Sequence, residues 1–324
     1  MSVAGTPNAN LPPRVSDHAP DEVLRRLELT VGRRLDGLLQ GDYRGLVPGH
    51  GSEAGETRLY TAGDDVRRID WNVTARMQQA HVRETIADRE LETWLLVDLS
   101  PSTDFGTALC TKRDLAVAAA GAVAFLTGRS GNRVGAHIIT GQGIETVPAR
   151  SGDVHVRALM HKVIAAPRGD GGGTTDLESG LARMATMRIR RGLAVVVSDF
   201  ITSSPLEPSW QRTLRMVAAR HETLAVELID PRELELPDVG VMIVVDPETG
   251  DSREVNTGSA DLRRRYAEGA RAQREAIARS LRSVGADHLV LRTDRDWLVD
   301  LVRFVALRRR RIDHLRRARA GAGS

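Results

Sequence analysis

The sequence WLLVDLSPS, residues 94–102, decides the fold of this chain. Its four leading apolar residues predict a buried strand, and Asp98, Ser100 and Ser102 follow that strand at alternate positions. A tight loop can aim alternate side chains at one point above the edge of a sheet. The stretch therefore predicts a buried strand with a cluster of oxygen ligands at its carboxyl end.

The rest of the chain alternates apolar runs with helical patterns. We expect strands at 94–97, 133–140, 144–148, 193–197, 223–229 and 288–292, and helices at 108–127, 154–165, 177–187, 210–220, 260–284 and from 296 to about 311. Near-continuous apolar runs separated by helices predict an α/β fold with a doubly wound, mostly parallel sheet covered on both faces. Ligands of such sheets bind at the carboxyl ends of the strands.

Two later segments supply further oxygen ligands. A Gly-rich loop, GDGGGTTDLESGL at 169–181, carries Thr174 and Thr175, and Asp199 follows the apolar run 193–197. Carboxylate and hydroxyl oxygens, without Cys or His, favour a hard cation that keeps some of its waters. The sequence thus predicts a Mg2+ site, with Mn2+ or Ca2+ as alternatives. Another interpretation stays open for each part, because Asp, Ser and Thr are also usual residues of turns and helix N-caps.

The order Asp98-x-Ser100-x-Ser102, then Thr175, then Asp199 resembles the metal-ion-dependent adhesion site of von Willebrand factor A domains. This resemblance favours Thr175 over the preceding Thr, because TDLESGL at 175–181 follows the spacing of that family. It implies that Ser100, Ser102 and Thr175 bind Mg2+ directly, while the two Asp bind through water or orient the hydroxyls. A Glu or Asp of a protein partner would complete the octahedron.

A second resemblance covers nearly the whole folded chain, from about residue 41 to residue 310. The segment RLYTAGDDVRRIDWNVTAR at 58–76 resembles the signature of bacterial proteins classed as domain of unknown function 58. The turn DPETG at 246–250, with DH at 287–288 and TD at 293–294, is similar to that family too. The resemblance implies a von Willebrand A-like domain and a MoxR-type AAA+ ATPase as partner, with a shared task in chaperone-like assembly or maturation of client proteins.

The signature segment also has a physical interpretation of its own. Its charged residues predict Arg and carboxylate pairs that fasten the segment to the sheet domain, with Trp71 as the apolar anchor. The residues expected in this ion-pair network are Asp64, Asp65, Arg67, Asp70 and Arg76. As an alternative, Asp64 or Asp70 reaches the metal site or a partner.

Four regions follow from these patterns. We expect a disordered N-terminus at 1–20, the signature segment packed on the sheet domain at 21–92, a von Willebrand A-like domain with an inserted β-hairpin (238–258) at 93–307, and a basic C-terminal tail at 308–324. The N-terminal residues show no secretory signal, and the apolar run 115–127 is too short to span a bilayer. From these two features we expect the cytoplasm as the location. The single Cys110 excludes an intramolecular disulfide and a Cys-based zinc site.

The composition is that of a globular protein with an uneven charge distribution. Hydrophobic residues make up 41% and charged residues 27% of the chain. Residues 308–324 carry seven Arg and one Asp, a charge of +6, so the net charge of +3 leaves −3 for the rest. Such a tail fits contact with nucleic acid or anionic lipid, although a solvated helix end is the simpler interpretation.

The sequence lacks the motifs of the common enzyme classes. A haloacid dehalogenase site needs Asp-x-Asp, and the third position here is Ser100. No GxxxxGK[ST] loop, HExxH pair or GxSxG elbow occurs. We therefore expect a non-catalytic, metal-dependent protein-interaction module. Two alternatives remain: a Mg2+-dependent phosphohydrolase that uses Asp98 and Asp199, or a scaffold whose metal site stays empty.

Overall fold

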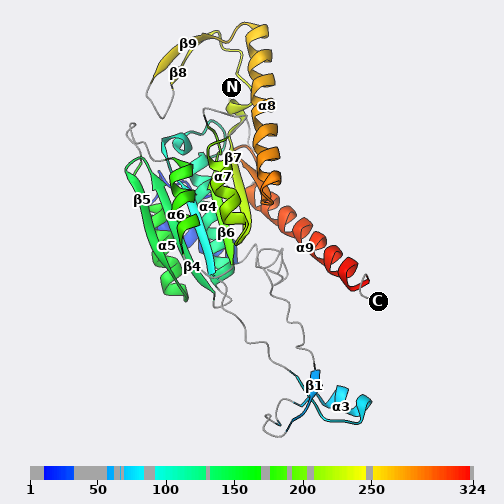
Figure 1. Cartoon of the computed structure of the whole chain (residues 1–324). Helices are drawn as coiled ribbons and strands as arrows, with labels where there is room; N and C mark the ends of the chain where they lie inside the picture. The colour runs from blue at the N-terminus through cyan, green and yellow to red at the C-terminus, as the bar shows by residue number, and fades with distance from the viewer. Residues whose placement is uncertain are drawn as a thin grey trace. The chain divides into compact units, whose positions relative to one another are not determined.

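The computed structural model contains two compact units, Gly49–Glu90 and the remainder, Met1–Pro48 with Leu91–Ser324 (Figure 1). The structure describes residues 11–32, 57–61, 66, 69–83, 92–128, 132–168, 176–187, 192–202, 208–245 and 251–321.

The larger unit is built on a central sheet whose described strands run in the order β10-β7-β6-β3-β4-β5. Every neighbouring pair is parallel except β4 with β5, which is antiparallel. This arrangement confirms the predicted α/β class with a mostly parallel sheet. The strands are β3 (Glu92–Asp98), β4 (Arg133–Thr140), β5 (Gly143–Arg150), β6 (Leu193–Ser198), β7 (Glu222–Ile229) and β10 (Asp287–Arg292).

The strand order reverses at the centre of the sheet, between β3 and β6. From β3 the chain passes to β4 on one side, and it later returns to β6 on the other side of β3. Both strands are buried along their whole length, which explains why their sequences are continuous apolar runs without alternation. In open α/β sheets the crevice at such a reversal, at the carboxyl ends of the strands, is where ligands bind.

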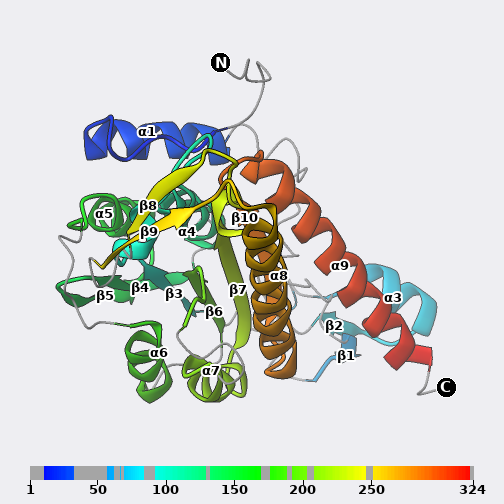
Figure 2. The same cartoon turned by 90° about the horizontal axis from the view of Figure 1, so that it is seen from above.

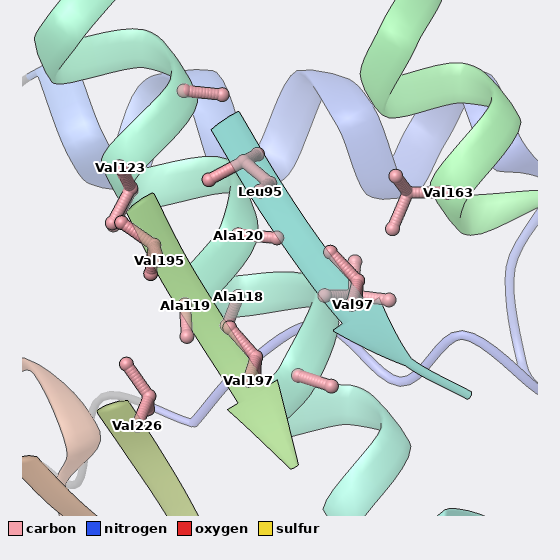
Figure 3. Close-up of a cluster of buried hydrophobic side chains, with 14 of the residues drawn as sticks. Leu95, Val97, Ala118, Ala119, Ala120, Val123, Val163, Val195, Val197 and Val226 are labelled. Carbon is pink, nitrogen blue, oxygen red and sulfur yellow. The ribbon is translucent and has the colours of Figure 1, made fainter. Parts of the chain in front are cut away.

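Helices cover both faces of the sheet and create two hydrophobic cores. One core lies under α1, α4, α5 and α9, and the other under α6, α7 and α8. Figure 3 shows Ala118, Ala119 and Ala120 of α4 beside strand residues such as Val195 and Val197, so small side chains let this helix lie close to the sheet. The helix bounds are α1 (Pro20–Thr30), α4 (Lys112–Gly128), α5 (Asp153–Ile164), α6 (Leu177–Thr186), α7 (Trp210–Ala218), α8 (Ala260–Ser283) and α9 (Trp297–Gly321). None of the described helices has both the length and the apolar character that a membrane span needs.

The helix α1 was not expected from the sequence. Its residues Val23 and Leu27, with Val31 after it, are fully buried in the core beside α4 and α5. Their spacing of four forms the apolar stripe of a surface helix. The preceding residues are also tied down, since the backbone N–H of Val15 donates to Asp114 Oδ1 at 2.8 Å. The described part of the chain before residue 33 therefore belongs to the larger unit, unlike the expected boundaries of 1–20 and 21–92.

A hairpin projects from the larger unit between β7 and α8. It consists of β8 (Val241–Val245) paired antiparallel with β9 (Ser252–Asn256), within the expected range 238–258. Figures 1 and 2 place it beyond the carboxyl ends of the sheet strands, on the same side as the start of α8. Four of the five aliphatic residues of β8 are exposed, among them Ile243 at 68%.

In its described residues, the smaller unit is a short ribbon with a helix. Strands β1 (Thr57–Leu59) and β2 (His81–Arg83) pair antiparallel, and α3 (Trp71–Met77) lies between them in the sequence. Ile69 forms an isolated bridge with Val82. The helix α3 was not expected from the sequence.

The basic C-terminal region is part of a helix rather than a separate tail. The helix α9 runs without interruption from Trp297 to Gly321. Arg308, where the tail was expected to begin, is buried and donates to Asp287 Oδ2 at 2.6 Å and to Glu222 Oε2 at 2.9 Å. These two carboxylates lie at the amino ends of β10 and β7, so Arg308 joins the helix to the sheet.

Replacing Arg308 with Leu is expected to lower the free energy of unfolding by about 1.5 to 3 kcal/mol, because charge-assisted hydrogen bonds are lost at a buried position. Urea unfolding followed by circular dichroism measures the change. Arg311→Leu is the matched control, since Arg311 also contacts Asp287 but is 70% exposed; we expect a change within about 0.5 kcal/mol. Equal effects of the two substitutions would contradict the structural role of Arg308.

Candidate metal centre

The first part of the centre is the carboxyl end of β3. Asp98 is the last residue of the strand and is buried. Its Oδ1 accepts a hydrogen bond from the backbone N–H of Ser100 at 3.0 Å, and its Oδ2 accepts one from Ser198 Oγ at 2.7 Å. The carboxylate is thereby held between β3 and the neighbouring β6, at the reversal of strand order.

The two serines of the motif lie together next to Asp98. Ser100 Oγ is 3.2 Å from Ser102 Oγ, and Ser100 is buried. Between them begins a short 3-10 helix, η4 (Pro101–Asp104), with Thr103 donating its backbone N–H and its hydroxyl to the carbonyl of Ser100. This tight turn brings the hydroxyls of Ser100 and Ser102 together. Thr175 lies outside the described residues, so its place relative to the serines stays a prediction.

The second part of the centre follows β6. Asp199 is buried directly after the strand, and its Oδ1 accepts the backbone N–H of Ile201 at 3.1 Å. The next residue, Phe200, has φ of 56°, in the left-handed region that a bulky residue seldom adopts. Trp210 stabilises this turn, because its Nε1–H donates to the carbonyl of Phe200 at 3.2 Å and the two rings meet edge to face. Such strain is typical of functional sites.

The two carboxylates of the centre influence each other. Burial raises the pKa of Asp98 and the charge of Asp199 raises it further, although hydrogen bonds from Ser100 and Ser198 act in the opposite direction. Burial also acts to raise the pKa of Asp199, but the charge and hydrogen bond of Lys112 outweigh it and hold that pKa below its usual range. A cation between the two carboxylates would relieve the repulsion that Asp98 experiences.

The sequence interpretation missed Lys112. This residue opens α4, is buried, and places Nζ 2.8 Å from Asp199 Oδ2 and 2.6 Å from Glu233 Oε1. A signal was present in the composition, because Lys112 and Lys162 are the only lysines among 46 basic residues. A compact ammonium fits between two carboxylates where the larger guanidinium fork of Arg does not.

The ion pairs extend from Lys112 into a buried network. Glu233, in the short 3-10 helix η5 (Pro231–Glu233), also accepts from Arg274 of α8 at 2.9 Å. Arg274 donates to Glu227 Oε1 and to the backbone carbonyl of Asp199, both at 3.0 Å. The network therefore links the end of β6 to the middle of α8 and to β7.

The donor set fits a hard cation. Asp98, Ser100, Ser102 and Asp199 present only oxygen atoms, which suit Mg2+ better than softer metals. Both oxygens of Asp98 accept hydrogen bonds from the described residues, and a carboxylate has about four lone-pair sites, so it can still accept water or a cation. Within the described residues, no group of three or more His, Cys, Asp and Glu is arranged for a metal. A centre of this kind would instead depend on hydroxyls.

Two members of the expected ion-pair network, Asp70 and Arg76, lie in the described part of the signature segment. Asp70 caps α3, since its Oδ1 accepts the backbone N–H groups of Asn72 and Val73 at 3.1 and 3.2 Å. Arg76 Nε donates to the carbonyl of Asn72 at 3.4 Å. Trp71 is 70% exposed within the smaller unit, and its role as an apolar anchor to the sheet domain stays a prediction. The remaining members, Asp64, Asp65 and Arg67, lie outside the described residues.

The chain is similar to known bacterial proteins over most of its length. A family model described as "Protein of unknown function DUF58" matches residues 56–276. Uncharacterized proteins of Mycobacterium bovis and Mycobacterium tuberculosis are each 54% identical over 287 residues, which cover 89% of this chain and 89% of each relative. An uncharacterized protein of Mycobacterium avium is 47% identical over 164 residues, covering 51% of this chain and 94% of that relative. The crystal structure of the conserved hypothetical protein BatB from Bacteroides thetaiotaomicron aligns with a TM-score of 0.40 and 12% identity, covering 68% of this chain and 99% of that chain.

Proposed function

The chain belongs to the family described as protein of unknown function DUF58, and we propose that this member is a non-catalytic, divalent-cation-dependent protein-interaction module. Its larger unit would then be a von Willebrand A-like domain. Its partner would be a protein that offers a Glu or Asp to the cation, with a MoxR-type AAA+ ATPase as the partner that the family resemblance favours. Chaperone-like assembly or maturation of client proteins is the corresponding task.

One observation carries the proposal. Asp98, Ser100 and Ser102 converge at the end of β3, and Asp199 lies beside them at the end of β6. This is the point of strand reversal, where open α/β sheets bind ligands. The repulsion between two buried carboxylates also makes the site favourable for a positive charge.

Each side chain has a definite task in this proposal. The hydroxyls of Ser100 and Ser102 would hold the ion directly, together with Thr175. Asp98 and Asp199 would orient these hydroxyls and bind through water. When bound, the cation supplies a fixed double positive charge that attracts a partner carboxylate, and such charge pairs in a partly dry interface favour specific association.

An exposed apolar strand supports a protein partner over a small phosphorylated substrate. The aliphatic strand β8 lies at the end of the unit where β3 and β6 also end (Figures 1 and 2). Val241, Ile243 and Val245 of this strand are all more than half exposed. Contiguous exposed apolar side chains of this kind mark protein interaction sites. A partner bound at the cation would therefore meet an apolar surface nearby.

Mg2+ is expected to raise the thermal midpoint of the protein in proportion to ln(1 + [Mg2+]/Kd), because it binds the folded state alone. The double substitution Ser100→Ala with Ser102→Ala should remove this shift and leave the fold intact. Differential scanning calorimetry with Mg2+ and with EDTA measures both. Ser151→Ala with Ser209→Ala, two exposed serines elsewhere, is the matched control and should keep the full shift. An equal shift in the Ser100 and Ser102 variant would disprove the assignment.

A purified MoxR-type AAA+ ATPase from the same organism tests the partner. Its binding to this chain should require Mg2+, disappear in EDTA and fail with the Ser100 and Ser102 variant. Cation binding without ATPase binding would keep the centre and reject this partner. Turnover of a phosphate ester that is abolished by Asp98→Ala would favour the phosphohydrolase instead.

A further inference from the structure

Lys112 occupies an unusual place for a positive charge. Its side chain is about as buried as the hydrophobic core, at 1% exposure, and its ammonium touches both Asp199 and Glu233. Burial acts to lower the pKa of Lys112, but the two carboxylates together outweigh it and keep the pKa above its usual value. The chain thus carries a permanent cation of its own beside the predicted divalent one.

This internal cation already neutralises Asp199, one of the two carboxylates of the candidate centre. A divalent ion placed near Asp98 and Asp199 would be repelled by the Lys112 charge, which is held by the same Asp199 carboxylate. Like charges at such short range in a poorly solvated site interact strongly. The ion and the ammonium therefore compete for one carboxylate.

Glu233 makes an exchange between the two possible. It contacts Lys112 at 2.6 Å, so the ammonium retains a partly buried anion if Asp199 turns toward a divalent ion. Arg274 holds Glu233 in place from the other side through Oε2 at 2.9 Å. Neither the ammonium nor Asp199 is left without a counter-charge in either arrangement, which keeps the cost of the exchange low.

We propose that Lys112 sets the cation affinity of the centre: its ammonium holds Asp199 until a divalent ion binds, and it then pairs with Glu233 alone. The inference rests on the proposed function, since it concerns the same site. It makes the centre a weak, exchangeable one, suited to an interaction that forms and dissociates with the cation. Lys112 is a positioning residue here and contacts neither the ion nor the partner.

The test is Lys112→Met in the full chain, with Mn2+ as the probe. Removing the ammonium leaves Asp199 without its counter-charge, so Mn2+ should bind at least about tenfold more tightly, a change of about 1.4 kcal/mol. Electron paramagnetic resonance of free Mn2+ gives the Kd for Mn2+ and requires no activity assay. The protein without cation should be less stable than wild type, and Mn2+ should restore most of the lost thermal midpoint.

Two further variants keep the result interpretable. Lys162→Met removes the other lysine, which is about half exposed and pairs with Glu145, and should leave the Mn2+ affinity unchanged. Lys112→Gln removes the charge but keeps a hydrogen-bond donor, so it serves if the Met variant does not fold. In an Asp199→Asn background, the gain in affinity on losing Lys112 should disappear, because the contested carboxylate is gone.

The outcomes separate this inference from the proposed function. If wild type binds Mn2+ and the Lys112 variants bind it with the same or lower affinity, the role of Lys112 is disproved and the centre stands. If no variant binds Mn2+, and Asp98→Ala changes nothing, both fail and Lys112 is a permanent structural ion. A tenfold gain that is absent in the Asp199→Asn background establishes the exchange.

Discussion

Replacing Trp210 with Ala is expected to lower the free energy of unfolding by about 3 to 5 kcal/mol, the usual cost of truncating a buried aromatic residue. Trp210 is 1% exposed and packs in the core under α6, α7 and α8. Its ring meets that of Phe200 with centroids 5.3 Å apart, and its Nε1–H donates to the Phe200 carbonyl. The substitution thus removes apolar area and leaves a buried carbonyl without its donor.

The same substitution should also affect cation binding at the candidate centre. Phe200 follows Asp199 and adopts a left-handed backbone conformation, which costs free energy unless the surroundings fix it. Without Trp210 we expect the turn to relax and the Mg2+-dependent thermal shift to decrease. Urea unfolding measures the stability and calorimetry measures the shift.

Trp71→Ala is the matched control, because the same residue type is 70% exposed in the smaller unit. It should change the stability by no more than about 0.5 kcal/mol. The sequence-based expectation of Trp71 as a buried anchor predicts instead a loss of about 3 to 5 kcal/mol for Trp71→Ala. A loss of that size would support the anchor and contradict the small effect expected here.

The sequence predicted the sheet well because its strands carry strong local signals. The run Leu193–Val197 is apolar throughout, and the structure extends the strand by one residue to Ser198. Such strands are buried on both faces, so the pattern reports burial directly. The same reasoning located Asp98 and Asp199, because a polar residue at the end of such a run has to lie at the sheet edge.

The start of α4 was predicted incorrectly, because local sequence signals do not determine it. A helix from residue 108 was expected, whereas α4 begins at Lys112. The preceding residues are held away from helical geometry by distant partners: Thr107 donates its backbone N–H and hydroxyl to Asp230, and the N–H of Leu109 donates to the carbonyl of Thr293. A short sequence window does not contain partners more than a hundred residues away, so it could not predict these contacts.

The charge network was missed for the same reason. Lys112, Glu233 and Arg274 come from two helices and a 3-10 turn that are far apart in the sequence. No spacing rule connects them, and each reads as an ordinary charged residue of a helix. The helix α1 is a different case, because its apolar stripe and the Pro20 at its first position were visible as a helix signal.

Replacing Arg274 with Leu is expected to lower the free energy of unfolding by about 3 kcal/mol, the lower end for breaking a buried ion pair from one side. Arg274 bridges Glu227 and Glu233 and donates to the Asp199 carbonyl. The effect stays at the lower end because Glu227 retains His288 at 2.7 Å and Glu233 retains Lys112. Urea unfolding followed by circular dichroism measures the loss.

A second substitution identifies the cause of that loss. If unpaired charge is responsible, Arg274→Leu with Glu227→Gln should recover part of the stability, because the buried carboxylate left behind has been neutralised. Arg265→Leu is the control on the same helix, since Arg265 is 67% exposed and pairs only at the surface with Asp261 among the described contacts. It should change the stability by no more than about 0.5 kcal/mol. A loss for Arg274→Leu that the Glu227 substitution does not reduce would assign its role to packing of the side-chain stem. Arg274 would then stabilise the surroundings of the candidate centre by packing rather than by its charge.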